Sequence, residues 1–215
     1  MIKKILRLAL SGFIALSSLL VLILRVFVGI DFYTGVVLRW NWAYLQYFTS
    51  LSNFYNGVIF GCIFVLSLIH FKEDDYSFSK VWKILALSAT VGVTVTFLVT
   101  IFFLNFVLPD PLVLYLSELL FFHIINPLVT IALFLLLLPG EKISWKESLW
   151  GALPLFVYSI FYSVFVISGV WSDFYNFTFG GHYWTVAIAL PVIWGLGFGL
   201  SLLFAFLNAK INKLK

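Results

Sequence analysis

Residues 47–56 read YFTSLSNFYN and form a polar patch near the start of a long apolar run. On an α-helix, which turns about 100° per residue, Thr49, Ser52, Asn53 and Asn56 follow the i, i+3, i+4, i+7 spacing and share one face. Side chains that hydrogen-bond are costly in hydrocarbon unless they meet partners, so a polar stripe on a spanning helix faces the bundle interior or a wet cavity. This stripe therefore indicates a helix with a buried face and a first candidate for a functional site.

The composition identifies the class of protein. Hydrophobic residues make up 63% of the 215 residues and charged residues 10%, whereas soluble domains carry about 25% charged residues. The chain is therefore expected to be an all-α integral membrane protein with no soluble domain. The formal net charge of +4 does not indicate nucleic-acid binding, because the basic residues are scattered over short connections and form no patch.

Spans of about 20 residues with short connections would fill the chain as a single membrane domain, residues 1–215. The first apolar stretch is longer than a signal-peptide core and lacks an Ala-x-Ala cleavage site, so we interpret it as a retained helix. We expect a bundle of six transmembrane helices at residues 8–30, 42–70, 81–107, 112–138, 149–170 and 183–207.

The basic residues predict the orientation of this bundle. Eleven of the thirteen Lys and Arg residues fall at the N-terminus, in or beside the second and fourth connections, and at the C-terminus, whereas Arg25 and Arg39 fall near the other side. By the positive-inside rule, the N- and C-termini are expected to be cytoplasmic. Arg25 is expected to extend its side chain to the membrane interface, and the alternative is that it grips an acidic group.

A second polar stripe occurs in the fourth expected helix. There His123, Asn126, Pro127 and Thr130 repeat the spacing of the first stripe. Both helices run from outside to inside, which places Thr49 and His123 at comparable depths in the outer half of the membrane. We therefore expect the two stripes to face each other across a pocket between the second and fourth helices that opens toward the outer leaflet.

The two stripes contain the parts of an acyl-transfer dyad. A threonine hydroxyl must give up its proton as it attacks a carbonyl, and a neutral histidine accepts and returns a proton near neutral pH. Thr49 and His123 are therefore candidates for nucleophile and general base of a hydrolase that acts on a membrane lipid ester. Further polar side chains are candidates for binding the substrate or its oxyanion, namely Ser52, Asn53, Asn56, Asn126, Tyr158 and Tyr162.

Other interpretations of the same residues stay open. Stripes of Ser, Thr and Asn also join membrane helices in purely structural proteins, and a transporter or lipid-binding protein can use a polar pocket without covalent chemistry. Glu118 lies about 140° from His123 around the helix axis and does not complete a triad from the same helix. It is interpreted as an interfacial or protonated carboxyl, or as an acid that faces another helix. No cluster of His, Cys or carboxylates predicts a metal site, and no cofactor is expected.

Small residues and the last connection carry weaker signals. The connection at residues 171–182 is aromatic and glycine-rich, and we expect a solvated outer loop, with Asp173 and His182 as an alternative binding point. Small residues four positions apart predict close helix packing at Ser88, Gly92 and Thr96 and at Gly195 and Gly199.

Three motifs together resemble the androgen-induced membrane protein family, in its bacterial branch. They are the run Tyr47-Phe48-Thr49 followed by Ser52-Asn53, the pair His123 and Pro127, and the loop with Asp173, Tyr175 and Phe177 before Gly180-Gly181. The resemblance covers nearly the whole chain from the second helix to the sixth. It implies six helices in a bacterial cell membrane and a threonine hydrolase of fatty acid esters of hydroxy fatty acids.

The resemblance also implies roles for two residues of this chain. The catalytic threonine of the animal members matches Thr49, and their catalytic histidine matches His123. Ser52-Asn53 stands here where the animal members carry more apolar residues, so the resemblance leaves the substrate open among related acyl lipids.

Overall fold

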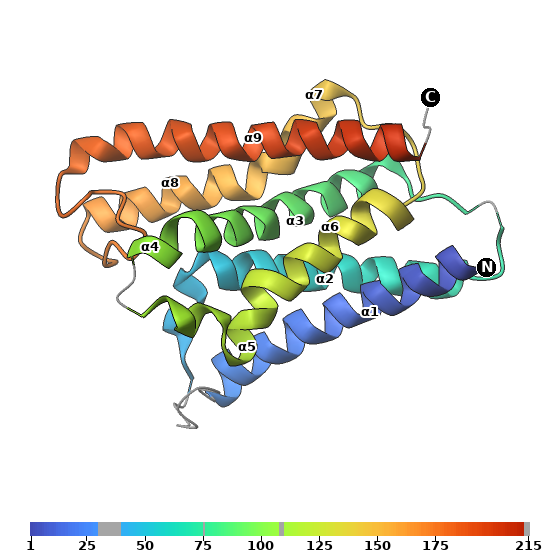
Figure 1. Cartoon of the computed structure of the whole chain (residues 1–215), viewed down its shortest axis with the longest axis horizontal. Helices are drawn as coiled ribbons and strands as arrows, with labels where there is room; N and C mark the ends of the chain where they lie inside the picture. The colour runs from blue at the N-terminus through green and yellow to red at the C-terminus, as the bar shows by residue number, and fades with distance from the viewer. Residues whose placement is uncertain (30–39, 75, 108–109, 213–215) are drawn as a thin grey trace.

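The computed structural model describes residues 1–29, 40–74, 76–107 and 110–212, and these residues form helices and connections without a strand. The helices run back and forth along one long axis, and the two chain ends lie at the same end of the bundle (Figure 1). Within the described residues, six helices are long and apolar enough to cross a membrane: Ile2–Val28, Phe48–Ile69, Lys80–Leu104, Glu118–Leu137, Trp145–Ile167 and Tyr183–Ile211. The prediction of an all-α bundle with six spans is confirmed.

The spans are assembled from several helical segments. The first three spans, together with the turns beside them, comprise α1 (Ile2–Ile23) with the π-helical η1 (Leu24–Val28), the 3₁₀ turn η2 (Trp42–Gln46) before α2 (Phe48–Ile69), and α3 (Lys80–Val99) with the π-helical η3 (Thr100–Leu104), followed by α4 (Asn105–Val107). The last three, again with the turns beside them, comprise η4 (Pro111–Tyr115) before α5 (Ser117–Leu120), the π-helical η5 (Phe121–Ile125) and α6 (Asn126–Leu137); α7 (Trp145–Ser148), η6 (Leu149–Ala152) and α8 (Leu153–Ile167); and η7 (Tyr183–Thr185) with α9 (Val186–Ile211).

Several helix ends differ from the predicted ones. The first helix begins at Ile2 instead of residue 8, because the lysines and arginine of its first turns are good helix formers. The backbone is extended at Tyr47, so α2 begins at Phe48 and residues 42–46 form a separate 3₁₀ turn. Leu116 is also extended, which separates the 3₁₀ turn after Pro111 from the fourth span.

Helix α3 lies at the centre of the bundle. It contacts α2, α6, α8 and α9, and every residue from Ala86 to Thr96 is buried. Its small residues pack on α2 as predicted. The hydroxyls of Ser88 and Tyr55 are 2.7 Å apart, and those of Thr96 and Ser52 are 3.1 Å apart.

The predicted packing at Gly195 and Gly199 is wrong within this chain. A Cβ atom at either position would have no neighbour within 4 Å, whereas a Cβ at Gly197 would stand 2.7 Å from Leu155 of α8. Two positions along a helix correspond to about 200° around its axis, so Gly197 lies on nearly the opposite face from Gly195 and Gly199. Helix α9 turns that other face toward α8.

Arg25 and Glu118 form an ion pair between η1 and α5. Both side chains are largely buried, with 11% and 3% of their surface exposed, and the guanidinium of Arg25 lies 5.2 Å from the ring centroid of Tyr44. Arg25 therefore follows the alternative that the sequence left open, and it grips an acidic group instead of extending to the interface. Inside a membrane, a carboxylate and a guanidinium are far less costly as a pair than apart.

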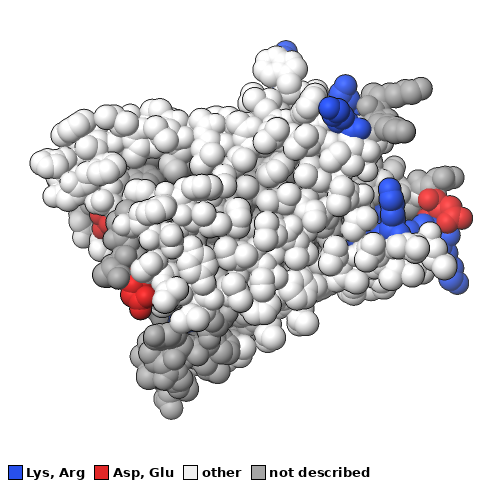
Figure 2. All heavy atoms as spheres, viewed as in Figure 1, with Lys and Arg blue, Asp and Glu red and all other residues white. Residues whose placement is uncertain are grey.

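The bundle end that holds the termini carries many of the basic side chains (Figure 2). Lys83 of α3 is fully buried there, and its ammonium donates to the carbonyls of Gly140 (3.4 Å) and Glu141 (2.7 Å) and to Oδ1 of Asn208 (2.9 Å). The backbone of Gly140 has a φ of +153°, and a Cβ at this position would clash with the carbonyl oxygen of Phe78, so the turn requires glycine.

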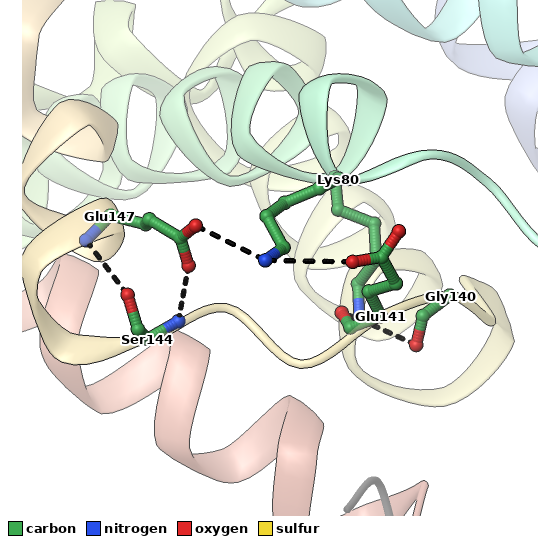
Figure 3. A network of polar contacts seen from close by, with 6 residues as sticks. Lys80, Gly140, Glu141, Ser144 and Glu147 are labelled. Atoms are coloured by element: carbon green, nitrogen blue, oxygen red, sulfur yellow. Dashed lines mark hydrogen bonds and ion pairs between the residues drawn. The ribbon is translucent and has the colours of Figure 1, made fainter.

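Lys80, one helical turn before the buried Lys83, forms two ion pairs near the surface. Figure 3 shows Lys80 between two carboxylates, 3.5 Å from Glu141 and 3.2 Å from Glu147. Ser144 and Glu147 form a capping box at the start of α7, in which each side chain bonds to the backbone of the other. Together with Lys83, these contacts hold the connection between α6 and α7 against α3.

We predict that Lys83→Met lowers the free energy of unfolding by about 3 kcal/mol, because three acceptors, among them the buried Oδ1 of Asn208, lose a charged donor. Thermal unfolding of the purified protein in detergent measures this change. Lys80→Met is the matched control and should change stability little, since its ion pairs are exposed. Equal effects of the two substitutions would show that the buried bonds of Lys83 do not stabilise this end of the bundle more than the exposed ion pairs of Lys80 do.

Candidate functional site

The two polar stripes face each other where α2 meets the fourth span. Nδ2 of Asn126 donates to Oδ1 of Asn53 at 3.1 Å, and Nδ2 of Asn56 donates to Oγ1 of Thr130 at 2.9 Å. None of these four side chains is exposed. The stripes are therefore joined by direct hydrogen bonds, and these amides fill the space in which the sequence predicted a pocket.

Helix α1 completes this polar layer. Oγ of Ser17 donates to Oδ1 of Asn126 at 2.8 Å, and Nδ2 of Asn126 donates to Oγ of Ser18 at 3.0 Å. Both polar atoms of the Asn126 amide are thus bonded to neighbouring helices. This residue acts as a junction of α1, α2 and α6.

Ser52 and Asn53 also bond to neighbouring helices. Oγ of Ser52 donates to the Thr49 carbonyl at 3.2 Å and lies 3.1 Å from Oγ1 of Thr96. Nδ2 of Asn53 donates to the carbonyls of Thr49 (2.9 Å) and Phe122 (3.2 Å). The structure thus places these two oxyanion candidates inside the helix packing, with their hydrogen bonds directed at protein atoms.

His123 lies in the π-helical segment η5, four residues before Pro127. Proline has no N–H, and its ring crowds the carbonyl four positions earlier, so the helix widens at this point. The imidazole of His123 meets η4, where Nδ1 lies 2.9 Å from the carbonyl oxygen of Leu114. A carbonyl can only accept, so Nδ1 carries the proton and Nε2 is the acceptor of the neutral ring.

Thr49 and His123 lie on neighbouring segments, because the amide of Asn53 bridges the carbonyl of Thr49 to that of Phe122, the residue before His123. No hydrogen bond joins Thr49 to His123 in the described ranges. The dyad that the sequence proposed stays a prediction.

Thr49 lines a pocket of about 320 Å³ between α2, α3, α8 and α9, toward the end of the bundle away from the chain termini. The walls are mostly apolar, and the exposed side chains of Phe179, Ile188 and Val192 stand at its rim. This location corrects the predicted one, because the pocket is bounded by the second, third, fifth and sixth spans. Six of its lining residues carry a hydroxyl group, namely Thr49, Thr96, Thr100, Tyr158, Ser159 and Tyr175.

Two tyrosines form the polar end of the pocket. The Tyr175 hydroxyl accepts the N–H of Phe48 at 2.9 Å, and its side chain lies close to those of Tyr158 and Thr49. The Tyr158 hydroxyl donates to the carbonyl of Gln46 at 2.6 Å. Burial raises the pKa of Tyr175 to about 12, although the bond from Phe48 acts to lower it. Tyr175 is therefore neutral at pH 7 and keeps a proton to donate.

Tyr162 bonds to the connection between α8 and η7 and is not among the residues that line the pocket. Its hydroxyl donates to Oδ1 of Asp173 at 2.7 Å and accepts the N–H of Tyr175 at 2.9 Å. The same carboxylate accepts the N–H of Phe177 at 2.9 Å and both the N–H and the hydroxyl of Thr178 at 2.6 Å. The loop around Asp173 is therefore a bonded turn that places Tyr175 over the pocket, while residues 179–182 of the same connection are exposed.

The sequence did not indicate Tyr175, Thr96 or Thr100 as site residues. Tyr175 comes from a connection without periodicity, and only its position within the aromatic motif marked it. Thr96 had been assigned to helix packing, and Thr100 stands alone on its helix face. No spacing rule predicts the π-helical segment that begins at Thr100.

Comparisons with known proteins find no match, whether to a protein-family model, to a curated protein or to a solved structure. The function is therefore inferred from the pocket and its side chains.

We predict that Asp173→Asn lowers the melting temperature at pH 7 and that the difference from the original protein closes as the pH falls. Burial acts to raise the pKa of Asp173, but the bonds from Thr178, Tyr162 and Phe177 outweigh it and hold the pKa below its ordinary value of 3.8. A carboxyl with a depressed pKa stabilises the fold above its unfolded pKa, and this stability is lost as the pH falls through the folded value.

Thermal unfolding measured from pH 7 down to below 3.8 tests this prediction. Asp110→Asn is the control, because Asp110 is exposed and lies in another connection of the chain. A pH-independent difference between Asp173→Asn and the original protein would contradict the prediction.

Proposed function

We propose that the chain binds an acyl lipid in the pocket beside Thr49 and hydrolyses its ester bond. The observation that carries this proposal is the position of Thr49, which lines a mostly apolar pocket of about 320 Å³ together with Tyr158 and Tyr175. Apolar pockets with a few convergent polar groups are the usual form of a site for such a ligand. The exposed apolar side chains at the rim, Ile188 and Val192, would face membrane lipid and allow entry from the side.

In the proposed reaction, Oγ1 of Thr49 attacks the ester carbonyl and its proton passes to Nε2 of His123. The tetrahedral intermediate collapses, the C–O bond to the alcohol breaks, and the alcohol leaves with that proton. Water then attacks the acyl-enzyme, gives a proton to His123 and releases the fatty acid, while the proton returns to Thr49. Tyr175, which is neutral and close to Thr49, can donate a hydrogen bond to the oxyanion.

The tautomer of His123 supports its role as the base. The Leu114 carbonyl holds the proton on Nδ1 and leaves Nε2 free of a proton, which is the form that a general base needs. Transfer from Thr49 requires Nε2 to approach the hydroxyl. Catalytic hydrogen bonds often tighten only when the substrate is bound, and a π-helical segment such as η5 is a place where a helix readjusts.

A second candidate function is lipid binding without covalent chemistry. It is favoured by one observation, namely that Thr49 and His123 share no hydrogen bond in the part of the chain that the structure describes. Transport is less well supported, because the pocket lies at the outer ends of the helices and the buried Lys83 network closes the other end of α3.

We also propose the orientation and setting that the sequence indicates, a bacterial cell membrane with both termini in the cytoplasm. This is supported by the common location of the two chain ends and of many basic side chains (Figures 1 and 2). Membership of the androgen-induced family is part of the same proposal. It is supported by the motifs at Thr49 and His123 and by the six spans.

We predict that the purified protein in detergent releases fatty acid from long-chain esters and that Thr49→Ala reduces this release to background. His123→Ala should lower turnover by at least about 100-fold, the usual contribution of a general base. Thr90→Val, which changes a buried threonine of α3 outside the pocket, is the control for damage to the bundle. Fatty-acid release is measured over a panel of esters with variants of matched melting temperature.

The outcomes separate the two candidate functions. Turnover that is lost in both Thr49→Ala and His123→Ala supports the hydrolase. Binding of the esters without release of fatty acid by the original protein would exclude the hydrolase and leave the lipid-binding function.

We predict that a membrane-impermeant maleimide labels Asp110→Cys in intact cells and does not label Lys146→Cys, each in a Cys62→Ala background. Both substituted positions are exposed at opposite ends of the bundle, and the orientation places residue 110 outside. After the membrane is permeabilised, both variants should be labelled. Labelling of Lys146→Cys alone in intact cells would reverse the proposed orientation.

A further inference from the structure

Thr100 differs from the other buried threonines of α3. The hydroxyls of Thr90, Thr94 and Thr96 each donate to the backbone carbonyl four residues earlier, at 2.7, 2.7 and 3.3 Å. Thr100 is equally buried, with 1% of its surface exposed, yet its Oγ1 has no hydrogen-bond partner in the described residues. Buried hydroxyls nearly always have a partner, because leaving one unpaired is costly.

The local backbone accounts for this difference. Thr100 opens the π-helical segment η3, and its N–H is shared between the carbonyls of Thr96 and Phe97. The wider turn changes the position of the side chain relative to the carbonyl four residues earlier, which the other threonines use. Single π-turns in α-helices occur frequently at functional sites.

Thr100, which carries this unpaired hydroxyl, is one of the residues that line the pocket beside Thr49. Helices α2 and α3 run antiparallel, and the contact between Ser52 and Thr96 fixes their register. Thr49 lies three residues before Ser52 and Thr100 four residues after Thr96, so both lie roughly 5 Å further toward the outer ends. Thr49 and Thr100 thus flank the pocket at similar heights on two different helices.

Other buried oxygens without a partner do not share this position. Ser50 and Asn56 each have one, and neither residue lines the pocket. The surroundings of Thr100 in the pocket are apolar, with Val99 and Phe103 as near neighbours in the chain. A hydrocarbon chain alone would leave this hydroxyl unpaired, whereas an oxygen atom on the ligand would satisfy it.

We propose that Thr100 is a ligand-binding residue whose hydroxyl donates a hydrogen bond to the carbonyl oxygen of an acyl lipid held beside Thr49. The ligand class is therefore an acyl chain that carries its carbonyl at the level of these two threonines, and the bond selects such a chain over plain hydrocarbon. The choice of an acyl ligand rests on the proposed function, but the role of Thr100 does not depend on turnover.

The test uses two photoreactive probes on the full chain in lipid nanodiscs, a long-chain methyl ketone and an alkane of the same length. The ketone keeps the carbonyl oxygen but has no bond that the protein can hydrolyse, so binding is measured apart from catalysis. Thr100→Val should raise the ketone concentration needed for half-maximal labelling about tenfold, the usual effect of one lost hydrogen bond, and should leave alkane labelling unchanged.

Matched variants control for packing. Thr94→Val removes a buried hydroxyl from the same helix outside the pocket, and it should leave the labelling by both probes unchanged. Thr100→Ser, which keeps the hydroxyl, should bind the ketone nearly as the original protein does. Melting temperatures of all variants are compared, so that a folding defect in Thr100→Val is seen and Thr100→Ser then decides the result.

Equal labelling of Thr100→Val and the original protein by the ketone would overturn the proposal, as would a parallel loss of ketone and alkane labelling. Failure of the proposed role of Thr100 can be distinguished from failure of the proposed hydrolase activity. If the ketone preference depends on Thr100 and esters are not cleaved, the hydrolase is wrong and the ligand-binding role holds. If esters are cleaved and the preference does not depend on Thr100, only this proposal is wrong.

Discussion

Hydrocarbon offers no hydrogen bonds, and this constraint determines how the spans of this protein pack. Asn126 bonds to α1 and α2 at once, Asn53 ties α2 to the backbone of η5, and Asn56 reaches Thr130 one layer deeper. The same requirement applies to charge, since Arg25 and Glu118 are buried as a pair. These polar groups of the spans meet partners on neighbouring helices, and the helices lie where those partners meet.

At the pocket this pattern of internal pairing is incomplete, because the hydroxyl of Thr100 has no hydrogen-bond partner in the described residues. Three irregular pieces of backbone surround the pocket: the extended residue Tyr47 before α2, the π-helical η3 at the end of α3, and the turn held by Asp173. Each of them sets hydroxyl groups at the rim or wall of an apolar space. A polar group of a ligand can then take the hydrogen bonds that the protein does not make within itself.

The sequence predicted the six spans and the two facing stripes because both follow from local rules. Span length needs only an apolar run, and the stripes need only helical periodicity, so Asn53 and Asn126 were placed on faces that meet. The position of the pocket did not follow. Asparagine amides are long enough to bond each other across a helix contact, and they fill the space in which the sequence suggested a cavity.

Helical periodicity could not predict the position of His123 or the fold of the loop around Asp173. Pro127 widens the helix before it into a π-turn, so His123 no longer follows the ideal spacing and meets Leu114 instead of Thr49. Tyr175 reaches Thr49 through a connection whose fold depends on one carboxylate, Asp173. Such placements depend on tertiary contacts that local pattern does not contain.

The most direct test of the central claim, that Thr49 forms an acyl-enzyme in an apolar pocket, is covalent labelling with a long-chain fluorophosphonate followed by peptide mass spectrometry. We expect one adduct, on Thr49, which is absent in Thr49→Ala and slower to form in His123→Ala. A protein that stays unmodified, or that is modified elsewhere while Thr49 remains free, would contradict this claim.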